Sequence, residues 1–172
     1  EKKERPTVGF CGFPQHYYRT KLLKALHHHN SIEDNFIYRS KYFWQLAKAL
    51  PPEKGKQLKE EYFDNIRLND FVVCSRGAGN YSFRFYETLR SGRIPILIDS
   101  DMPFPFEDEI EWENLVICKK TPEEIIATML EWCKHKDIAA IQRNCRRVWE
   151  NYLSRTAYMK NISILLGQRL SN

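Results

Sequence analysis

The chain has 172 residues, a length typical of one compact domain. Hydrophobic residues make up 42% of it and charged residues 28%, so a packed core is expected and general disorder is excluded. The sequence predicts no membrane span, because no apolar run approaches the roughly 20 residues that a bilayer requires, and the net charge of +5 is too small to indicate nucleic-acid binding by itself.

Short apolar runs alternate with longer amphipathic stretches along the chain. In chain order they predict a strand over 7–11, a helix near 16–28, a strand over 35–39, a helix over 53–67, a strand over 71–74, a helix over about 81–90, and strands over 94–98 and 115–118. Thr121-Pro122-Glu123-Glu124 has the cap, first-turn proline and acids that begin a helix. From Lys136 the chain is predicted to be helical almost to its end.

The predicted strands contain nearly continuous apolar runs (FVV, IPILI, LVI) instead of alternating ones. Such runs are typical of parallel strands that helices cover on both faces. The sequence therefore predicts a single α/β domain over 1–172, with a doubly wound, mostly parallel Rossmann-like sheet and a long C-terminal helical segment. In such sheets the ligand binds beyond the carboxyl ends of the strands, where the strand order reverses.

The segment 75–87, SRGAGNYSFRFYE, carries the densest functional signal. Gly77 and Gly79 follow a buried strand and precede a helix, so the backbone there can approach a ligand closely. The first turn of the helix presents N–H groups and a partial positive charge, which favour a phosphate. We therefore expect a nucleotide-diphosphate site at this turn.

Charged side chains in the same segment suit that ligand. Arg76 and Arg84 supply guanidinium groups, each of which can form bidentate hydrogen bonds to phosphate oxygens. Glu87 lies about one helical turn beyond Arg84, on the same face, where its carboxylate can accept hydrogen bonds from ribose hydroxyls. The alternative is a simple glycine turn with a surface arginine and an Arg84–Glu87 helix pair.

Two common nucleotide motifs are excluded in this segment. No Gly-Lys-Ser/Thr follows the glycines, as a P-loop requires, and the Gly-x-Gly is followed by Asn80-Tyr81-Ser82 instead of the dinucleotide-binding pattern. A dehydrogenase that uses NAD is therefore not expected.

The stretch RGAGNYSFRFYETLRSGRIPILIDSDMPFPFEDEIEWENLVI resembles the signature of exostosin-type glycosyltransferases: Arg-Gly-x-Gly, then Ser, Arg, Glu, Gly and Ile-Pro, followed by Pro-Phe and a Trp. With its flanks it covers about a quarter of the chain. The resemblance implies an inverting transferase with two Rossmann-like domains, of which this chain corresponds to the C-terminal, donor-binding half. The acceptor and the catalytic base are then expected largely in an N-terminal domain, and the isolated chain is not expected to be fully active.

Carried over by resemblance, the donor-site positions are Arg76, Gly77, Gly79, Ser82, Arg84 and Glu87, with Gly92 and Pro95 as structural positions. Asn80 lies within the same motif. Arg39, at the end of the second predicted strand, is a further candidate for donor phosphate on position alone. Arg76 and Arg84 are the residues expected to stabilise the leaving diphosphate, and no residue of the chain stands out as the base.

Asp99 and Asp101 follow the apolar strand at 94–98 and form an Asp-x-Asp pattern. In metal-dependent transferases such carboxylates hold Mg²⁺ or Mn²⁺ against the diphosphate. Because two arginines and a helix end can already neutralise the diphosphate, we favour contacts with hydroxyls of the donor sugar and expect no metal or other cofactor.

These features predict transfer of a sugar from a nucleoside-diphosphate sugar, which we expect to be a UDP-sugar, to an acceptor hydroxyl with inversion. The expected partners are the nucleotide sugar, a glycan acceptor and an N-terminal domain. The alternatives are a fucosyltransferase-like enzyme that uses a GDP-sugar and a non-catalytic Rossmann-like binding or interaction domain.

Cysteine content bears on the cellular compartment. The five cysteines are odd in number and none has CxxC spacing, which favours reduced thiols. A glycan on the Asn80 sequon would block the expected site. Both points favour the cytoplasm. The alternative is the Golgi lumen, if the chain is cut from a larger eukaryotic enzyme. The absence of an initial Met favours such an origin.

Overall fold

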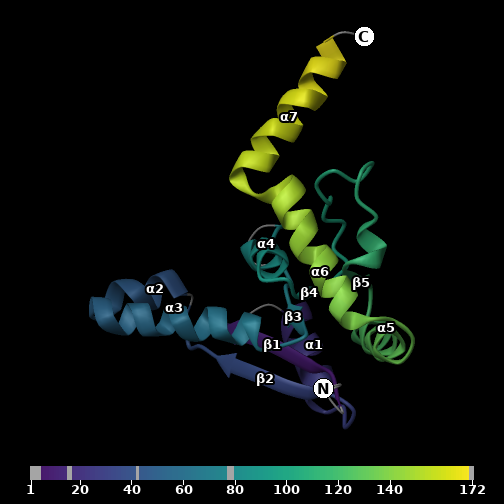
Figure 1. Cartoon of the computed structure of the whole chain (residues 1–172). Helices are drawn as coiled ribbons and strands as arrows, with labels where there is room; N and C mark the ends of the chain where they lie inside the picture. Colours follow the sequence, from purple (N-terminus) through teal and green to yellow (C-terminus); the bar gives the residue numbers. More distant parts are fainter. Residues whose placement is uncertain (1–4, 15–16, 42, 77–79, 171–172) are drawn as a thin grey trace.

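The computed structural model describes residues 5–14, 17–41, 43–76 and 80–170. Its centre is a sheet of five strands in the order β2-β1-β3-β4-β5, and every neighbouring pair is parallel. The strands are β1 (Thr7–Gly12), β2 (Glu33–Tyr38), β3 (Phe71–Val73), β4 (Ile94–Ile98) and β5 (Ile117–Lys119). The predicted parallel α/β sheet is confirmed (Figure 1).

Helices cover both faces of the sheet (Figure 1). They are α1 (Tyr17–His27), α2 (Phe43–Ala49), α3 (Pro52–Arg67), α4 (Phe83–Arg90), α5 (Pro122–His135), α6 (Ile138–Val148) and α7 (Arg155–Leu170). Helices α1 and α5 pack together on one side, while α3 packs on β1, and α4 and α6 pack on β4, on the other. The fold is therefore doubly wound, as the apolar strands predict.

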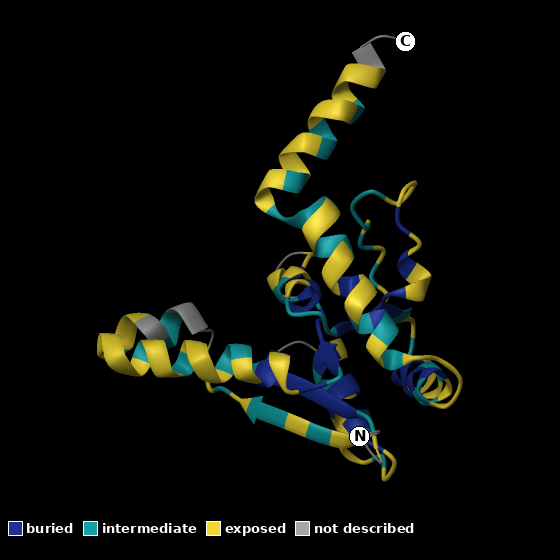
Figure 2. Cartoon of the chain, viewed as in Figure 1, coloured by how far each residue is buried: buried dark blue, intermediate teal, exposed yellow. Residues whose placement is uncertain are grey.

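The core lies along the middle of the sheet, where β1, β3 and β4 are buried on both faces (Figure 2). Phe10, Phe71 and Phe85 are fully buried and come from β1, β3 and α4. The outermost strand β2 is only partly buried. The hydrophobic contribution to stability therefore comes mainly from the three central strands and the helices that pack on them.

Local signals account for most element boundaries. The capping box predicted at Thr121 and Glu124 is present, since the Thr121 side chain accepts from the Glu124 N–H and the Glu124 carboxylate accepts from the Thr121 N–H. Gly92 ends α4 with φ of +62°, a left-handed conformation that glycine adopts without strain. The first feature agrees with the helix start predicted at 121–124, and the second lies just beyond the helix end predicted at residue 90.

Several element boundaries differ from the prediction by one or more residues; β2, for example, covers Glu33–Tyr38 instead of 35–39. The fifth strand begins at Ile117 instead of residue 115, because a 3₁₀ turn (Trp112–Asn114) precedes it and the Leu115 N–H donates to the Trp112 carbonyl. The helix α2 was not predicted at all. It has seven residues and begins with the aromatic residues Phe43 and Trp44, and Pro51-Pro52 follows it closely. No helical periodicity is therefore evident in its sequence.

The C-terminal segment is helical, as predicted, but bends once. A π-helical turn (Trp149–Leu153) follows α6, and Ser154 adopts an extended conformation before α7 begins. Helix α7 then extends away from the sheet and is largely exposed (Figures 1 and 2). Within the described residues, no helix combines the length and apolar character that a membrane crossing demands.

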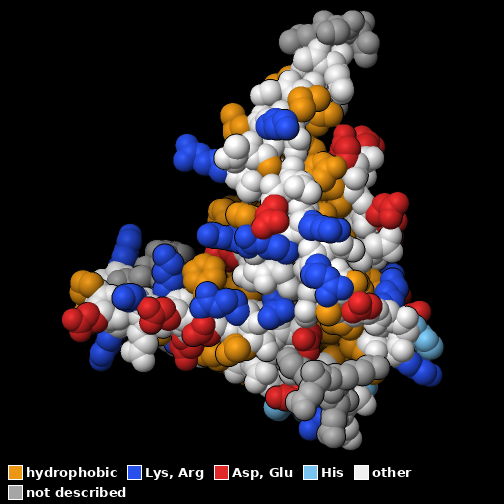
Figure 3. Space-filling model, in the orientation of Figure 1, with side chains coloured by type: hydrophobic (Ala, Val, Ile, Leu, Met, Phe, Trp, Pro, Cys, Tyr) orange, Lys and Arg blue, Asp and Glu red, His pale blue; other side chains and the backbone are white. Residues whose placement is uncertain are grey.

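Lys and Arg side chains gather over α4 and α6 on the face that Figure 3 shows. Arg146 donates to Glu150 at 2.7 Å and also to the Arg90 carbonyl at the end of α4. Arg146 therefore helps to hold α6 against α4.

Buried thiols make the stability of the fold depend on pH. None of the five cysteines is in a disulfide, and Cys74 and Cys145 are completely buried. Burial raises the pKa of each of these two thiols to about 12. Unfolding exposes them to water, where a thiol ionises near pH 9.

We predict that the free energy of unfolding falls as the pH rises from 9 towards 12. The unfolded chain loses thiol protons in this window while the folded chain keeps them, so each buried thiol costs about 1 kcal/mol of stability per pH unit. Urea unfolding at pH 8, 9, 10 and 11 measures the effect. The Cys74→Ala/Cys145→Ala variant should be less stable overall but less sensitive to pH, and an unchanged pH dependence in that variant would contradict the assignment.

Candidate functional site

The strand order reverses between β1 and β3. From β1 the chain passes to β2 on one side, whereas β3 is followed by β4 and β5 on the other. Parallel sheets of this kind open a crevice at the carboxyl ends of the two strands that flank the reversal. The segments that leave these ends are Phe13-Pro14 and Ser75-Arg76, so the predicted glycine turn begins at this crevice.

Arg84, in the first turn of α4, spans the gap between the two strands. Its Nη2 donates to the Cys11 carbonyl of β1 at 2.7 Å, and its Nη1 donates to the Val73 carbonyl of β3 at 3.3 Å. Its guanidinium carbon lies 4.6 Å from the ring centre of Phe10. A Cβ atom on Gly12 would lie 2.9 Å from Nη2, so any other residue there would displace the Arg84 guanidinium from this position.

Arg84 therefore has a structural role besides the predicted ligand contact. Among the described residues it forms no ion pair, so the alternative of a surface Arg84–Glu87 pair is not observed. Hydrogen bonds to neutral carbonyls leave its positive charge uncompensated.

Arg19, which is not among the predicted site residues, forms a second link across the same crevice. From α1 it donates to the carbonyl oxygens of Phe13 (2.8 Å), Ser75 (3.0 Å) and Arg76 (2.7 Å), and only 7% of the residue is exposed. A signal was present in the sequence, because Arg19 shares the buried stripe of α1 with Leu22, Leu23 and Leu26. An arginine on an apolar stripe requires buried partners.

The start of α4 has the features of an anion site. Ser82 is its N-cap residue, but the Ser82 side chain makes no capping hydrogen bond. Ser75 Oγ, Arg76 Nε and Arg84 Nε are buried and have no hydrogen-bond partner among the described residues. Such unsatisfied polar atoms are rare in protein interiors and often mark functional sites.

The acidic segment after β4 is joined to the segment that follows the glycine turn. Asn80 Nδ2 donates to the Ser100 carbonyl at 2.9 Å, and Ser100 Oγ donates to Asn80 Oδ1 at 2.7 Å. Asp99 accepts from the N–H of Asp101, and both carboxylates are exposed. The two predicted sugar-contacting residues thus lie on either side of Ser100, which is bonded to Asn80. Gly77 and Gly79 of the predicted diphosphate turn lie outside the described residues.

Glu87 and Arg39, the remaining predicted donor residues, both have side-chain partners. Glu87 accepts a hydrogen bond from the Tyr62 hydroxyl of α3. Arg39 forms an ion pair with Glu61 of α3, just beyond the carboxyl end of β2. A contact between either residue and a donor stays a prediction.

Burial raises the pKa of the Cys11 thiol at the carboxyl end of β1, and the positive charges of Arg39 and Arg84 oppose that rise. The neutral thiol therefore adds no negative charge to the crevice. In the described part of the chain no group of His, Cys, Asp and Glu residues is arranged to hold a metal ion. Asp99 and Asp101 are the two adjacent carboxylates that a divalent cation could approach.

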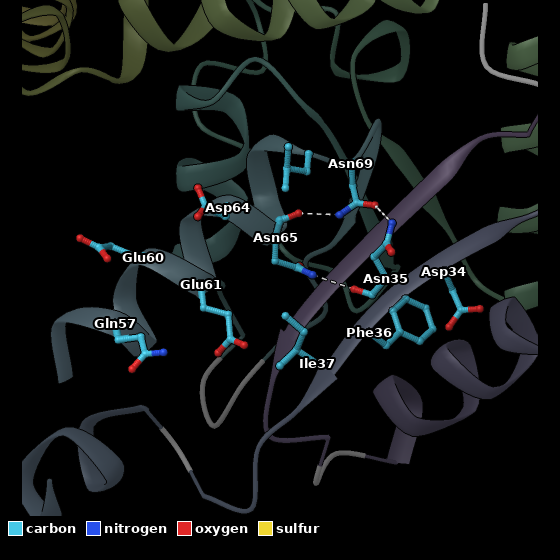
Figure 4. A pocket seen from close by; sticks show the side chains of 11 residues that line it. Asp34, Asn35, Phe36, Ile37, Gln57, Glu60, Glu61, Asp64, Asn65 and Asn69 are labelled. Carbon is cyan, nitrogen blue, oxygen red and sulfur yellow. Dashed lines mark hydrogen bonds between the residues drawn. The ribbon is translucent and has the colours of Figure 1, made fainter. Parts of the chain in front are cut away.

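A cavity of about 710 Å³ lies between β2 and α3 (Figure 4). Side chains that line it include the carboxylates of Asp34, Glu60, Glu61 and Asp64. Its two walls are joined by hydrogen bonds of 2.7 Å from Asn35 Nδ2 to Asn69 Oδ1 and from Asn65 Nδ2 to the Asn35 carbonyl, and Asn69 Nδ2 donates to the Asn65 carbonyl at 2.6 Å. Because carboxylates repel a phosphate, we do not place the diphosphate in this cavity.

Comparison with known proteins matches residues 12–131 to the exostosin GT47 domain. The chain is 30% identical over 94 residues to an exostosin-1 homolog of Caenorhabditis elegans, covering 54% of this chain and 25% of that protein. It is 26% identical over 141 residues to exostosin-1c of Danio rerio, covering 76% of this chain and 18% of that protein. It is 29% identical over 83 residues to probable glucuronosyltransferase 47 A of Physcomitrium patens, covering 48% of this chain and 18% of that protein.

The chain thus spans a quarter or less of the length of these relatives. The matched range includes β2, β3, β4, α4 and every predicted site residue from Arg39 to Asp101. Since the family match covers most of the chain, and since the fold and the sequence motif agree with it, the chain belongs to the exostosin GT47 domain family.

Proposed function

We propose that this chain is the donor-binding domain of a glycosyltransferase and that it binds a UDP-sugar at the crevice between β1 and β3. In the whole protein the sugar is transferred to an acceptor hydroxyl with inversion at the anomeric carbon. The observation that carries the proposal is the start of α4, where the N-cap residue Ser82 makes no side-chain cap to the helix, together with the buried atoms of Ser75, Arg76 and Arg84 that have no hydrogen-bond partner among the described residues. Family membership supports the same activity class.

The proposed chemistry follows from charge. As the bond between sugar and diphosphate breaks, negative charge develops on the leaving oxygen. Arg76, the positive charge of Arg84 and the N–H groups in the first turn of α4 stabilise that charge from fixed positions. The base that deprotonates the acceptor is assigned to no residue of this chain, and we place it in another part of the protein.

The sugar itself is proposed to lie towards Asp99 and Asp101, whose carboxylates accept hydrogen bonds from its hydroxyls. Two relatives are named as probable glucuronosyltransferases, so UDP-glucuronic acid and UDP-glucose are the donors to compare first. The two carboxylates repel an acidic sugar and favour a neutral one. The cytoplasmic location stays a prediction.

We predict that Arg76→Ala weakens UDP binding about tenfold to a hundredfold, because a charge-assisted contact is lost. Arg76 is a sharper probe than Arg84, whose removal would also break contacts to Cys11 and Val73. Isothermal titration with UDP and GDP measures the affinities, and UDP should bind more tightly.

The matched control for this test is Arg143→Ala, which removes the same charge from the exposed face of α6, where Arg143 lies 3.5 Å from Asp137. This control should bind UDP as the unchanged protein does. If Arg76→Ala binds UDP as tightly as the unchanged protein, the proposed diphosphate site is wrong. If the unchanged protein binds GDP more tightly than UDP, the donor is a GDP-sugar instead of a UDP-sugar.

We also predict that EDTA leaves UDP affinity unchanged within about twofold, since two guanidinium groups and a helix terminus compensate the diphosphate charge. The measurement is a titration with UDP before and after EDTA, followed by added Mg²⁺ or Mn²⁺. If EDTA abolishes binding and the metal restores it, Asp99 and Asp101 hold a cation and the metal-free proposal is wrong.

A further inference from the structure

Tyr62 joins the two helices that face the candidate site. It lies on α3, and its hydroxyl donates to Oε2 of Glu87 on α4, 25 residues away in the sequence. The centre of its ring lies 5.4 Å from the guanidinium carbon of Arg84. Tyr62 therefore contacts one of the two predicted donor residues of α4, Glu87, and packs near the other, Arg84.

The protonation of Tyr62 fixes the direction of this hydrogen bond. Burial raises the pKa of the Tyr62 phenol well above its usual range; the charge of Glu87 raises it further, while Arg84 opposes the rise. The phenol is therefore protonated at neutral pH and donates, and the ionised carboxylate accepts. Glu87 Oε1 has no hydrogen-bond partner among the described residues, so it remains available as an acceptor.

The same contact competes with an internal ion pair. Arg84 and Glu87 are three residues apart on one helix, a spacing at which opposite charges attract each other. In the structure Glu87 is bonded to Tyr62, and Arg84 is bonded to the carbonyls of Cys11 and Val73. Both charges therefore remain available to a ligand.

We propose that Tyr62 is a positioning residue: it orients Glu87 so that the free carboxylate oxygen accepts a ribose hydroxyl, and it thereby sets the preference for ribonucleotides over deoxyribonucleotides. This inference rests on the proposed function. Without the phenol, the Glu87 carboxylate can turn towards Arg84. It then no longer accepts from the ribose hydroxyl, and it partly neutralises the Arg84 charge that attracts the phosphate.

The test compares UDP with 2′-deoxy-UDP and 3′-deoxy-UDP by isothermal titration. The unchanged protein should bind UDP about tenfold more tightly than the analogue that lacks the contacted hydroxyl, as expected for a hydrogen bond to a charged group. In Tyr62→Phe that ratio should fall to about one to threefold, on the same basis. Glu87→Gln, which keeps the shape but removes the charge, should also reduce the ratio.

Tyr86→Phe is the matched control, because it removes a phenol from the exposed side of α4 next to Glu87. It should keep the full ratio, and circular dichroism should show that all three variants are folded. If Tyr62→Phe weakens UDP and both deoxy analogues equally, the role of Tyr62 is only structural and the inference is overturned while the donor site stands. If the unchanged protein binds all three nucleotides equally, the inference also fails, and if it binds none, the proposed function itself fails.

Discussion

The candidate site depends on two arginine side chains that join β1 to β3 where the ladder between them stops. That ladder pairs Val8 with Phe71 and Gly9 with Val72 and goes no further. Beyond it the strands separate, and buried carbonyls there need donors. Arg84 bridges the Cys11 and Val73 carbonyls, and Arg19 bridges the two segments that follow. Guanidinium groups suit this task because each carries five N–H donors in a fixed plane.

This arrangement reconciles a structural role of Arg84 with a ligand-binding role. A guanidinium that is neutralised by a carboxylate offers little to a phosphate, but carbonyl oxygens carry only partial charges. The positive charge of Arg84 is therefore retained at the floor of the crevice and held by packing near Phe10 and Tyr62. Because these partners are fixed before a ligand arrives, little reorganisation is required when a diphosphate binds.

The fold was largely predictable because its signals are local. Continuous apolar runs indicated the buried strands, and capping residues indicated α5. Helix α2 lacks such a signal, and the start of β5 depends on a turn that only tertiary packing selects. In the site, Arg76, Arg84 and Glu87 could be found from one motif. Arg19 and Tyr62 could not be assigned their roles in the same way, because their partners are 56 and 25 residues away.

Helix α4 links the core to the candidate site. Phe85, Thr88 and Leu89 lie on its buried face, whereas Arg84 and Glu87 point towards β1 and α3. Phe85 packs against Phe104 and Trp112, which follow Asp99 and Asp101 along the chain, so one aromatic cluster holds both the helix and the acidic segment. The positions of the proposed phosphate, ribose and sugar contacts are therefore set by the same packed side chains. A substitution that loosens this cluster should disturb all three contacts together, whereas Tyr62→Phe should leave the proposed sugar contacts at Asp99 and Asp101 in place.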